Sequence, residues 1–233
     1  MNMKKFLYLL FTMTIAVGLN ACSPDDDPVN EPPTEIPENP DDPDQPDNPD
    51  PDPNPTPDPN PTTGKTLIVY YSFTNNVHTI VSDLRTQIEA DVIRVEPAEK
   101  GLDYAANNYA IGSAQIQAIR NNPGSASSYP AIDPVEVDFG QYGMIIVAAP
   151  LWWSNMAAPL QTFLFNHGAE MAGKRIGLIV SSASSGISGV ESDAKRLIPD
   201  GNFLTPSLWI RSSQTSNCHS MIAQWLKDTG YTE

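Results

Sequence analysis

Short, almost continuously apolar runs are the feature that most restricts how this chain can fold. Thr66–Ser72, Met144–Ala149 and Arg175–Ser181 are rich in Ile, Val and Leu and carry little charge. Such runs are typical of strands in a parallel sheet whose two faces are both covered by helices. Two weaker runs, Asp91–Glu96 and the proline-containing Phe203–Ile210, bring the predicted set to five strands.

Helical patterns separate these strands. In Asn76–Ala90 apolar residues recur with a period of about 3.6, and helices are also predicted over Tyr104–Arg120, Pro159–Phe165, Val190–Ile198 and Ser216–Asp228. Strands that alternate with helices indicate an α/β fold, and right-handed crossovers leave few ways to wind it. The sequence therefore predicts a three-layer, doubly wound, five-stranded parallel sheet in one domain over residues 65–233.

The first 21 residues have the pattern of an export signal. Lys4 and Lys5 precede an apolar stretch that is too short for a stable membrane span, so residues 1–21 are predicted to be a signal peptide. The segment ends in Leu-Asn-Ala before Cys22, which resembles the lipobox of bacterial lipoproteins. This resemblance implies that Cys22 carries a lipid anchor. An ordinary secretory signal is the alternative, and either reading predicts export.

Residues 22–64 have a composition that cannot form a core. They contain fifteen of the 23 prolines and thirteen acidic residues, with no Lys or Arg. Such a segment is predicted to be a disordered, extended stalk. This segment supplies most of the net charge of −15. The chain from Lys65 onward contains fifteen acidic and eleven basic residues, and its net charge is only −4. Nothing in this balance favours nucleic acid as a partner.

The cysteines and histidines do not define a disulfide or metal site. If Cys22 carries lipid, Cys218 has no intramolecular partner, and a lone cysteine in an apolar helical pattern is typical of a buried side chain. The three histidines lack metal-site spacing, so no metal is predicted. The expected location is extracytoplasmic, on a bacterial and specifically an outer membrane, because Asp25–Asp27 resembles the surface-export signal of Bacteroidetes lipoproteins.

Three predicted loops follow strands at the carboxyl edge of the sheet, where ligands of open α/β folds bind. The first, Ser72–Val77, offers hydroxyls beside a helix N-terminus, which outlines an anion site. The alternative is that these residues only cap the helix. The third, Ser181–Gly189, consists almost entirely of small residues whose backbone can approach a ligand, or that form a solvent loop.

The second loop, Pro150–Met156, contains adjacent tryptophans. Trp152 and Trp153 either cover the core or flank a flat conjugated ring. Two further aromatic residues, Tyr104 and Tyr109, lie on the predicted helix near this edge. Either they close over a ligand or they pack into the core.

Together the three loops resemble those of flavodoxins, and more closely the flavodoxin-like proteins exported by Bacteroidetes. The family's first loop reads Ser/Thr-x-Thr-Gly-Asn-Thr, which Ser72, Thr74 and Asn76 match, while Asn75 replaces the glycine and Val77 the last threonine. The family's Gly-x-Pro-x-Trp-Trp stretch is matched at Pro150, Trp152 and Trp153, and its Ser/Thr-rich loop at Ser182, Gly186 and Gly189.

This resemblance implies the strand order 2-1-3-4-5 and FMN at the switch point, a placement that belongs to flavodoxins and not to the periodicity of this chain. It implies the cofactor-binding residues Ser72, Thr74, Asn75, Asn76, Val77, Pro150, Leu151, Trp152, Trp153, Ser154, Ser182, Ala183, Ser184, Gly186 and Gly189. The expected function is FMN-dependent electron transfer, or an oxidoreductase that moves electrons from NAD(P)H to a quinone-type acceptor. The residues do not identify the redox donor or acceptor. The alternative is a surface binding module that has lost the flavin.

Overall fold

The protein is described here by a computed structural model, which covers residues 64–231. The predicted signal peptide at 1–21, the lipid on Cys22 and the stalk, up to residue 63, lie outside the described residues. Within residues 64–231, no helix has both the length and the apolar character needed to cross a membrane.

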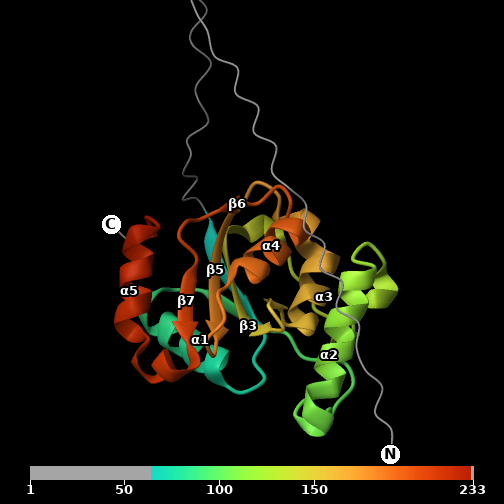
Figure 1. The fold of residues 1–233 in the computed structure, drawn as a ribbon. Helices are drawn as coiled ribbons and strands as arrows, with labels where there is room; N and C mark the ends of the chain where they lie inside the picture. The colour runs from blue at the N-terminus through green and yellow to red at the C-terminus, as the bar shows by residue number, and fades with distance from the viewer. Residues whose placement is uncertain (1–63, 232–233) are drawn as a thin grey trace, which may run out of the picture. The chain divides into compact units, whose positions relative to one another are not determined.

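The centre of the domain is a parallel sheet between two layers of helices (Figure 1). Its main strands are β1 (Lys65–Tyr70), β2 (Asp91–Arg94), β3 (Tyr142–Trp152) and β5 (Arg175–Ser182). They are arranged in the order β2-β1-β3-β5, and all of these pairings are parallel. The predicted three-layer sheet with the order 2-1-3-4-5 is confirmed, with the last position divided between two short strands.

The fifth predicted strand, Phe203–Ile210, is interrupted. β6 (Asn202–Phe203) and β7 (Leu208–Arg211) both pair in parallel with β5, and Pro206 lies between them. Proline has no N–H to donate to a strand ladder, and it is therefore confined to sheet edges and breaks. The prediction of one continuous strand was wrong for this reason.

Within residues 64–231, five α-helices cover the sheet (Figure 1). They are α1 (Asn76–Gln87), α2 (Ala106–Asn121), α3 (Ala158–His167), α4 (Ser188–Leu197) and α5 (His219–Asp228). Short 3-10 helices occur at Ala126–Ser128, Phe139–Gln141, Gly168–Met171 and Ser212–Asn217. Helix α1 ends at Gln87, before the predicted Ala90. Helix α5 begins at His219, after the predicted Ser216, because Ser212–Asn217 forms a 3-10 helix.

The alternation of side chains along the strands produces two cores. Leu67 and Val69 of β1 face α2, α3 and α4, whereas Ile68 and Tyr70 face α1 and α5. All four side chains are buried. Burial on both faces explains why the strand runs in the sequence are continuously apolar.

Helix α2 contains an irregular first turn. Asn107, Asn108 and Tyr109 all have left-handed backbone conformations, with φ of 49°, 56° and 62°. Asparagine adopts this region more readily than most residues, but tyrosine does so rarely. Tyr109, the last residue of this turn, remains 49% exposed.

Candidate functional site

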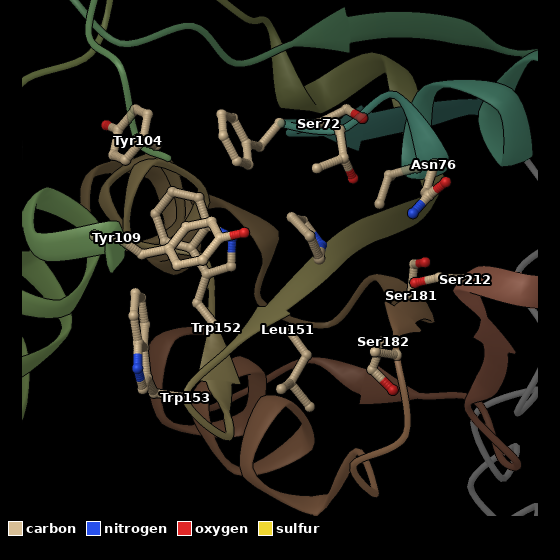
Figure 2. A pocket seen from close by; sticks show the side chains of 16 residues that line it. Ser72, Asn76, Tyr104, Tyr109, Leu151, Trp152, Trp153, Ser181, Ser182 and Ser212 are labelled. Carbon is tan, nitrogen blue, oxygen red and sulfur yellow. The ribbon is translucent and has the colours of Figure 1, made fainter. Parts of the chain in front are cut away.

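A pocket of about 360 Å³ opens at the carboxyl ends of β1, β3 and β5 (Figure 2). Its polar end is formed by serine and asparagine side chains, including Ser72, Asn76, Ser181 and Ser212. Its opposite end is aromatic. Figure 2 labels Tyr104, Tyr109, Trp152 and Trp153 there, and Phe73 also lines the pocket with its ring centroid 5.7 Å from that of Tyr104.

The polar end is built around the start of α1. Asn75 has a left-handed conformation with φ of 62°, which turns the chain into the helix. The buried Ser72 Oγ accepts a hydrogen bond from the His78 N–H at 3.2 Å. The N–H groups of Asn76 and Val77 lie at the first turn, where a helix provides no acceptor of its own. These donors and the positive end of the helix favour an anion.

The predicted second loop is a tight hairpin. Strand β3 continues through Trp152, and it pairs in antiparallel fashion with β4 (Asn155–Met156). The two-residue turn consists of Trp153 and Ser154, both left-handed with φ of 46° and 66°. Positive φ at both positions defines the hairpin turn whose twist matches that of the strands. The prediction of a loop over Pro150–Met156 is therefore corrected.

The two tryptophans have different surroundings. Trp152 lies in an aromatic cluster, with ring centroids 5.6 Å from Tyr71, 6.3 Å from Phe73 and 5.0 Å from Tyr104. Trp153 makes an edge contact with Trp152 at 6.4 Å and remains 41% exposed. Trp153 thus has a ring face available at the rim, whereas Trp152 mainly supports the wall of the pocket.

Two adjacent serines at the end of β5 also differ. The Ser182 hydroxyl donates to the Ser185 carbonyl oxygen and accepts from the Trp209 indole N–H, both at 2.8 Å. The Ser181 hydroxyl is buried in the pocket lining and has no hydrogen-bond partner among the described residues. A buried hydroxyl without a partner is destabilising, so a ligand atom that bonds Ser181 would remove this penalty.

The pocket brings together most of the residues predicted for the cofactor. Those that line it are Ser72, Thr74, Asn76, Val77, Pro150, Leu151, Trp152, Trp153, Ser182 and Ala183. Those that do not line it are Asn75, Ser154, Ser184, Gly186 and Gly189. Asn75 and Ser154 instead shape the backbone turns.

Some lining residues were missed from the sequence. Ser212 follows β7, so the carboxyl end of a further strand was the available signal. Gly112 lies under both indole rings, because an added Cβ would be 3.1 Å from Trp153 and 3.3 Å from Trp152. Ser181 was inside the predicted third loop, but only Ser182 was assigned to the cofactor, and both line the pocket.

The pocket has no charged side chain in its described lining. Burial is the main effect that raises the pKa of the Tyr104 hydroxyl, and the Glu99 carboxylate adds to it. Tyr104 is therefore neutral at physiological pH. Among residues 64–231, no cluster of His, Cys, Asp or Glu is arranged to hold a metal ion. The site is suited to a ligand with a flat apolar part and an anionic end.

The sequence model of the flavodoxin family matches residues 65–229. This match covers more than half of the chain, and the chain therefore belongs to the flavodoxin family. The family assignment agrees with the sheet order and with the position of the pocket at the carboxyl edge. No match was found among curated proteins.

Solved structures of flavoproteins share this fold. A putative flavoprotein from Bacteroides eggerthii DSM 20697 is 21% identical, with a TM-score of 0.57, over 71% of this chain and 98% of that chain. A putative flavoprotein from Bacteroides uniformis ATCC 8492 is 22% identical, with a TM-score of 0.56, over 70% and 98%. A flavoprotein from Lactobacillus acidophilus NCFM in complex with FMN is 20% identical, with a TM-score of 0.52, over 67% and 99%. At these identities the likeness shows the fold.

Proposed function

We propose that the domain binds FMN in this pocket and acts in electron or hydride transfer. The observation that carries the proposal is one uncharged pocket with a helix N-terminus at one end and an exposed indole at the other. Its volume of about 360 Å³ is within the range of small-molecule sites. The family match and the FMN complex of the Lactobacillus flavoprotein support the same cofactor.

Each part of the pocket has a role in this proposal. The hydroxyls of Ser72 and Thr74, with the first N–H groups of α1, would hold the phosphate. The buried Ser181 hydroxyl, which lacks a partner in the described chain, would bond a polar atom of the ligand. The ring would lie at the aromatic end, against Trp153.

Bound FMN supplies the redox chemistry, while the protein supplies binding, orientation and electrostatics. The aromatic wall would cover part of the ring, and the neutral lining would place no fixed charge beside it. We further propose that the protein is exported and held on a bacterial membrane by a lipid on Cys22. Both an electron carrier and a reductase fit the site.

The first test separates the contribution of the phosphate to binding from that of the ring, by calorimetric titration with FMN and with riboflavin. Thr74→Ala removes an exposed hydroxyl at the pocket, and a bond to a charged phosphate contributes about 1.5–3 kcal/mol. FMN should bind roughly tenfold more weakly or worse, while riboflavin should be unaffected. Thr86→Ala, on the exposed far end of α1, is the matched control and should change neither ligand.

The ring end is tested by Trp153→Ala. This variant should weaken FMN and riboflavin alike, by roughly twofold to tenfold, because aromatic stacking contributes about 0.5–1.5 kcal/mol. If the wild-type protein binds neither ligand at high micromolar concentration, the redox function is excluded. A flavin-free binding module would then be the better account of the domain.

A further inference from the structure

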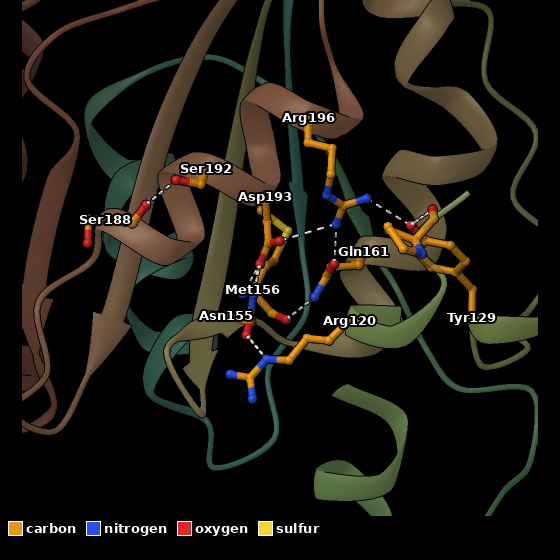
Figure 3. A network of polar contacts seen from close by, with 10 residues as sticks. Arg120, Tyr129, Asn155, Met156, Gln161, Ser188, Ser192, Asp193 and Arg196 are labelled. Atoms are coloured by element: carbon orange, nitrogen blue, oxygen red, sulfur yellow. Dashed lines mark hydrogen bonds and ion pairs between the residues drawn. The ribbon is translucent and has the colours of Figure 1, made fainter. Parts of the chain in front are cut away.

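The hairpin that contains Trp153 is hydrogen-bonded by helix α2, which does not contribute to the polar end of the pocket. Arg120, near the end of α2, donates from Nε to the Asn155 side-chain oxygen at 2.8 Å, and it also donates to the Trp153 carbonyl oxygen. Figure 3 shows Arg120 beside Asn155. Its guanidinium thus joins the turn residue of the hairpin to the first residue of β4.

A buried network holds the same hairpin from the other side (Figure 3). The Asp193 carboxylate, on α4, accepts from the Asn155 side-chain amide at 2.8 Å and from the Met156 N–H at 2.9 Å. Its second oxygen pairs with Arg196 at 3.2 Å. The Gln161 amide, on α3, donates to the Met156 carbonyl oxygen at 2.7 Å. Strand β4 is therefore bonded by α2, α3 and α4, whereas the turn residue Trp153 is bonded through its carbonyl oxygen by α2.

The turn needs this support because its backbone is unfavourable. Trp153 and Ser154 both have positive φ, and residues in such conformations persist where the surroundings over-determine them. Helix α2 also contacts the ring of Trp153 at Gly112, where an added Cβ would be 3.1 Å away. One helix therefore fixes both the backbone and the indole of Trp153.

We propose that Arg120 is a positioning residue for the ring-binding end of the pocket. It does not line the pocket, and it acts through the orientation of Trp153. Helix α2 would then govern affinity for the flat ring while leaving the phosphate end unchanged. This inference rests on the proposed FMN function and adds to it a residue outside the ligand contacts.

The test is a double-mutant cycle in the full chain, with riboflavin as the probe. Arg120→Met should weaken riboflavin by roughly threefold to tenfold, the range of an aromatic stacking contact. In the Trp153→Ala background the same substitution should have no further effect, because the indole side chain that Arg120 positions has been removed. Arg85→Met, an exposed arginine on α1, is the matched control and should be neutral in both backgrounds.

Arg120→Lys completes the series. A lysine ammonium is a compact point donor, whereas the guanidinium fork reaches two acceptors, so riboflavin affinity should be intermediate. An equal loss for Arg120→Met in both backgrounds would overturn the proposal, since the effect would not pass through Trp153. A neutral Arg120→Met in the otherwise wild-type chain would overturn it as well.

A ligand-free measurement keeps this inference separable from the FMN proposal. Acrylamide quenching of indole fluorescence should increase in Arg120→Met but not in Arg85→Met, and the increase should disappear in the Trp153→Phe background. If wild type binds no flavin but this quenching pattern is found, the proposed function fails and the support of Trp153 by Arg120 stands. If quenching does not change, the positioning role is rejected.

Discussion

At the residue scale, two glycines of the third predicted loop have different surroundings. A Cβ on Gly189 would lie 1.8 Å from the Ser154 carbonyl oxygen, so α4 and the tryptophan hairpin are in direct contact there. A Cβ on Gly186 would have no heavy atom within 4 Å. Gly189 is required for close packing, and Gly186 is not.

This contrast gives a stability prediction. Gly189→Ala should lower the free energy of unfolding by about 1–3 kcal/mol, as for other overpacked sites. Gly186→Ala should leave it unchanged or slightly higher, because alanine reduces the freedom of the unfolded chain. Thermal unfolding followed by circular dichroism compares the two variants directly. Equal melting temperatures would show that the hairpin yields to the extra methyl group.

Cys218 is the described cysteine, and it is 3% exposed. Burial, assisted by the nearby Asp83 carboxylate, raises the pKa of its thiol. The reactive thiolate is therefore scarcer than in a free cysteine at the same pH. Iodoacetamide should label Cys218 in denaturant and leave it unlabelled in the native protein, as peptide mass analysis will show. Native labelling at the rate of a model peptide would contradict this burial.

The sequence predicted serines at the end of β5 and assigned Ser182 to the cofactor, whereas Ser181 has the hydroxyl without a partner among the described residues. The difference between the two hydroxyls depends on Trp209 of β7, whose indole N–H donates a hydrogen bond to the Ser182 hydroxyl. Such a contact joins residues far apart in the chain, and a local pattern contains no information about it. The same limit applies to Trp152 and Trp153, whose different exposures follow from tertiary packing.

At the scale of elements, the positions of β1, β2, β3 and β5 followed from apolar runs, whereas the divided last strand and the hairpin did not. Two-residue hairpin turns are recognised by Asn-Gly or Asp-Gly, whereas this turn is Trp153-Ser154. The left-handed turn at Asn107–Tyr109 was likewise hidden within a helical pattern. Both elements form the aromatic wall of the pocket, where tertiary contacts override local preference.

The unfavourable turn predicts a stabilising substitution. Left-handed conformations cost non-glycine residues roughly 1–2 kcal/mol, so Ser154→Gly should raise the free energy of unfolding by about 1 kcal/mol. Ser192→Gly, within α4, is the contrasting control and should lower it by roughly 0.5 kcal/mol. Urea unfolding measures both changes. A loss of stability in Ser154→Gly would mean that the serine side chain supports the hairpin.

At the scale of the whole molecule, the parallel α/β class was predictable because each strand is separated from the next by a helix, whereas the order 2-1-3-4-5 was implied by the resemblance to flavodoxins. Right-handed crossovers then restrict the winding. The pattern of apolar runs did not predict that the last strand is divided at Pro206, or that Ser212 lines the pocket. Both belong to the edge of the sheet, where pairing on one side leaves the chain more freedom.

The proposed anchor also makes a prediction. Cys22→Ala removes the proposed site of lipid attachment and should release the protein from the membrane fraction. Carbonate washing followed by immunoblotting of pellet and supernatant distinguishes the outcomes, with the Cys218→Ala variant as the control that stays in the pellet. If Cys22→Ala remains in the pellet, another part of the chain holds the protein.

The direction of β1 has a consequence for access to the protein. The strand runs from Lys65 to Tyr70, and the chain reaches the pocket mouth two residues later at Ser72. With a rise of about 3.3 Å per residue, this path separates the two edges of the sheet by roughly 20 Å. The start of β1 and the mouth of the pocket therefore lie at opposite edges of the sheet, so that the approach of a partner to the pocket does not pass the start of β1.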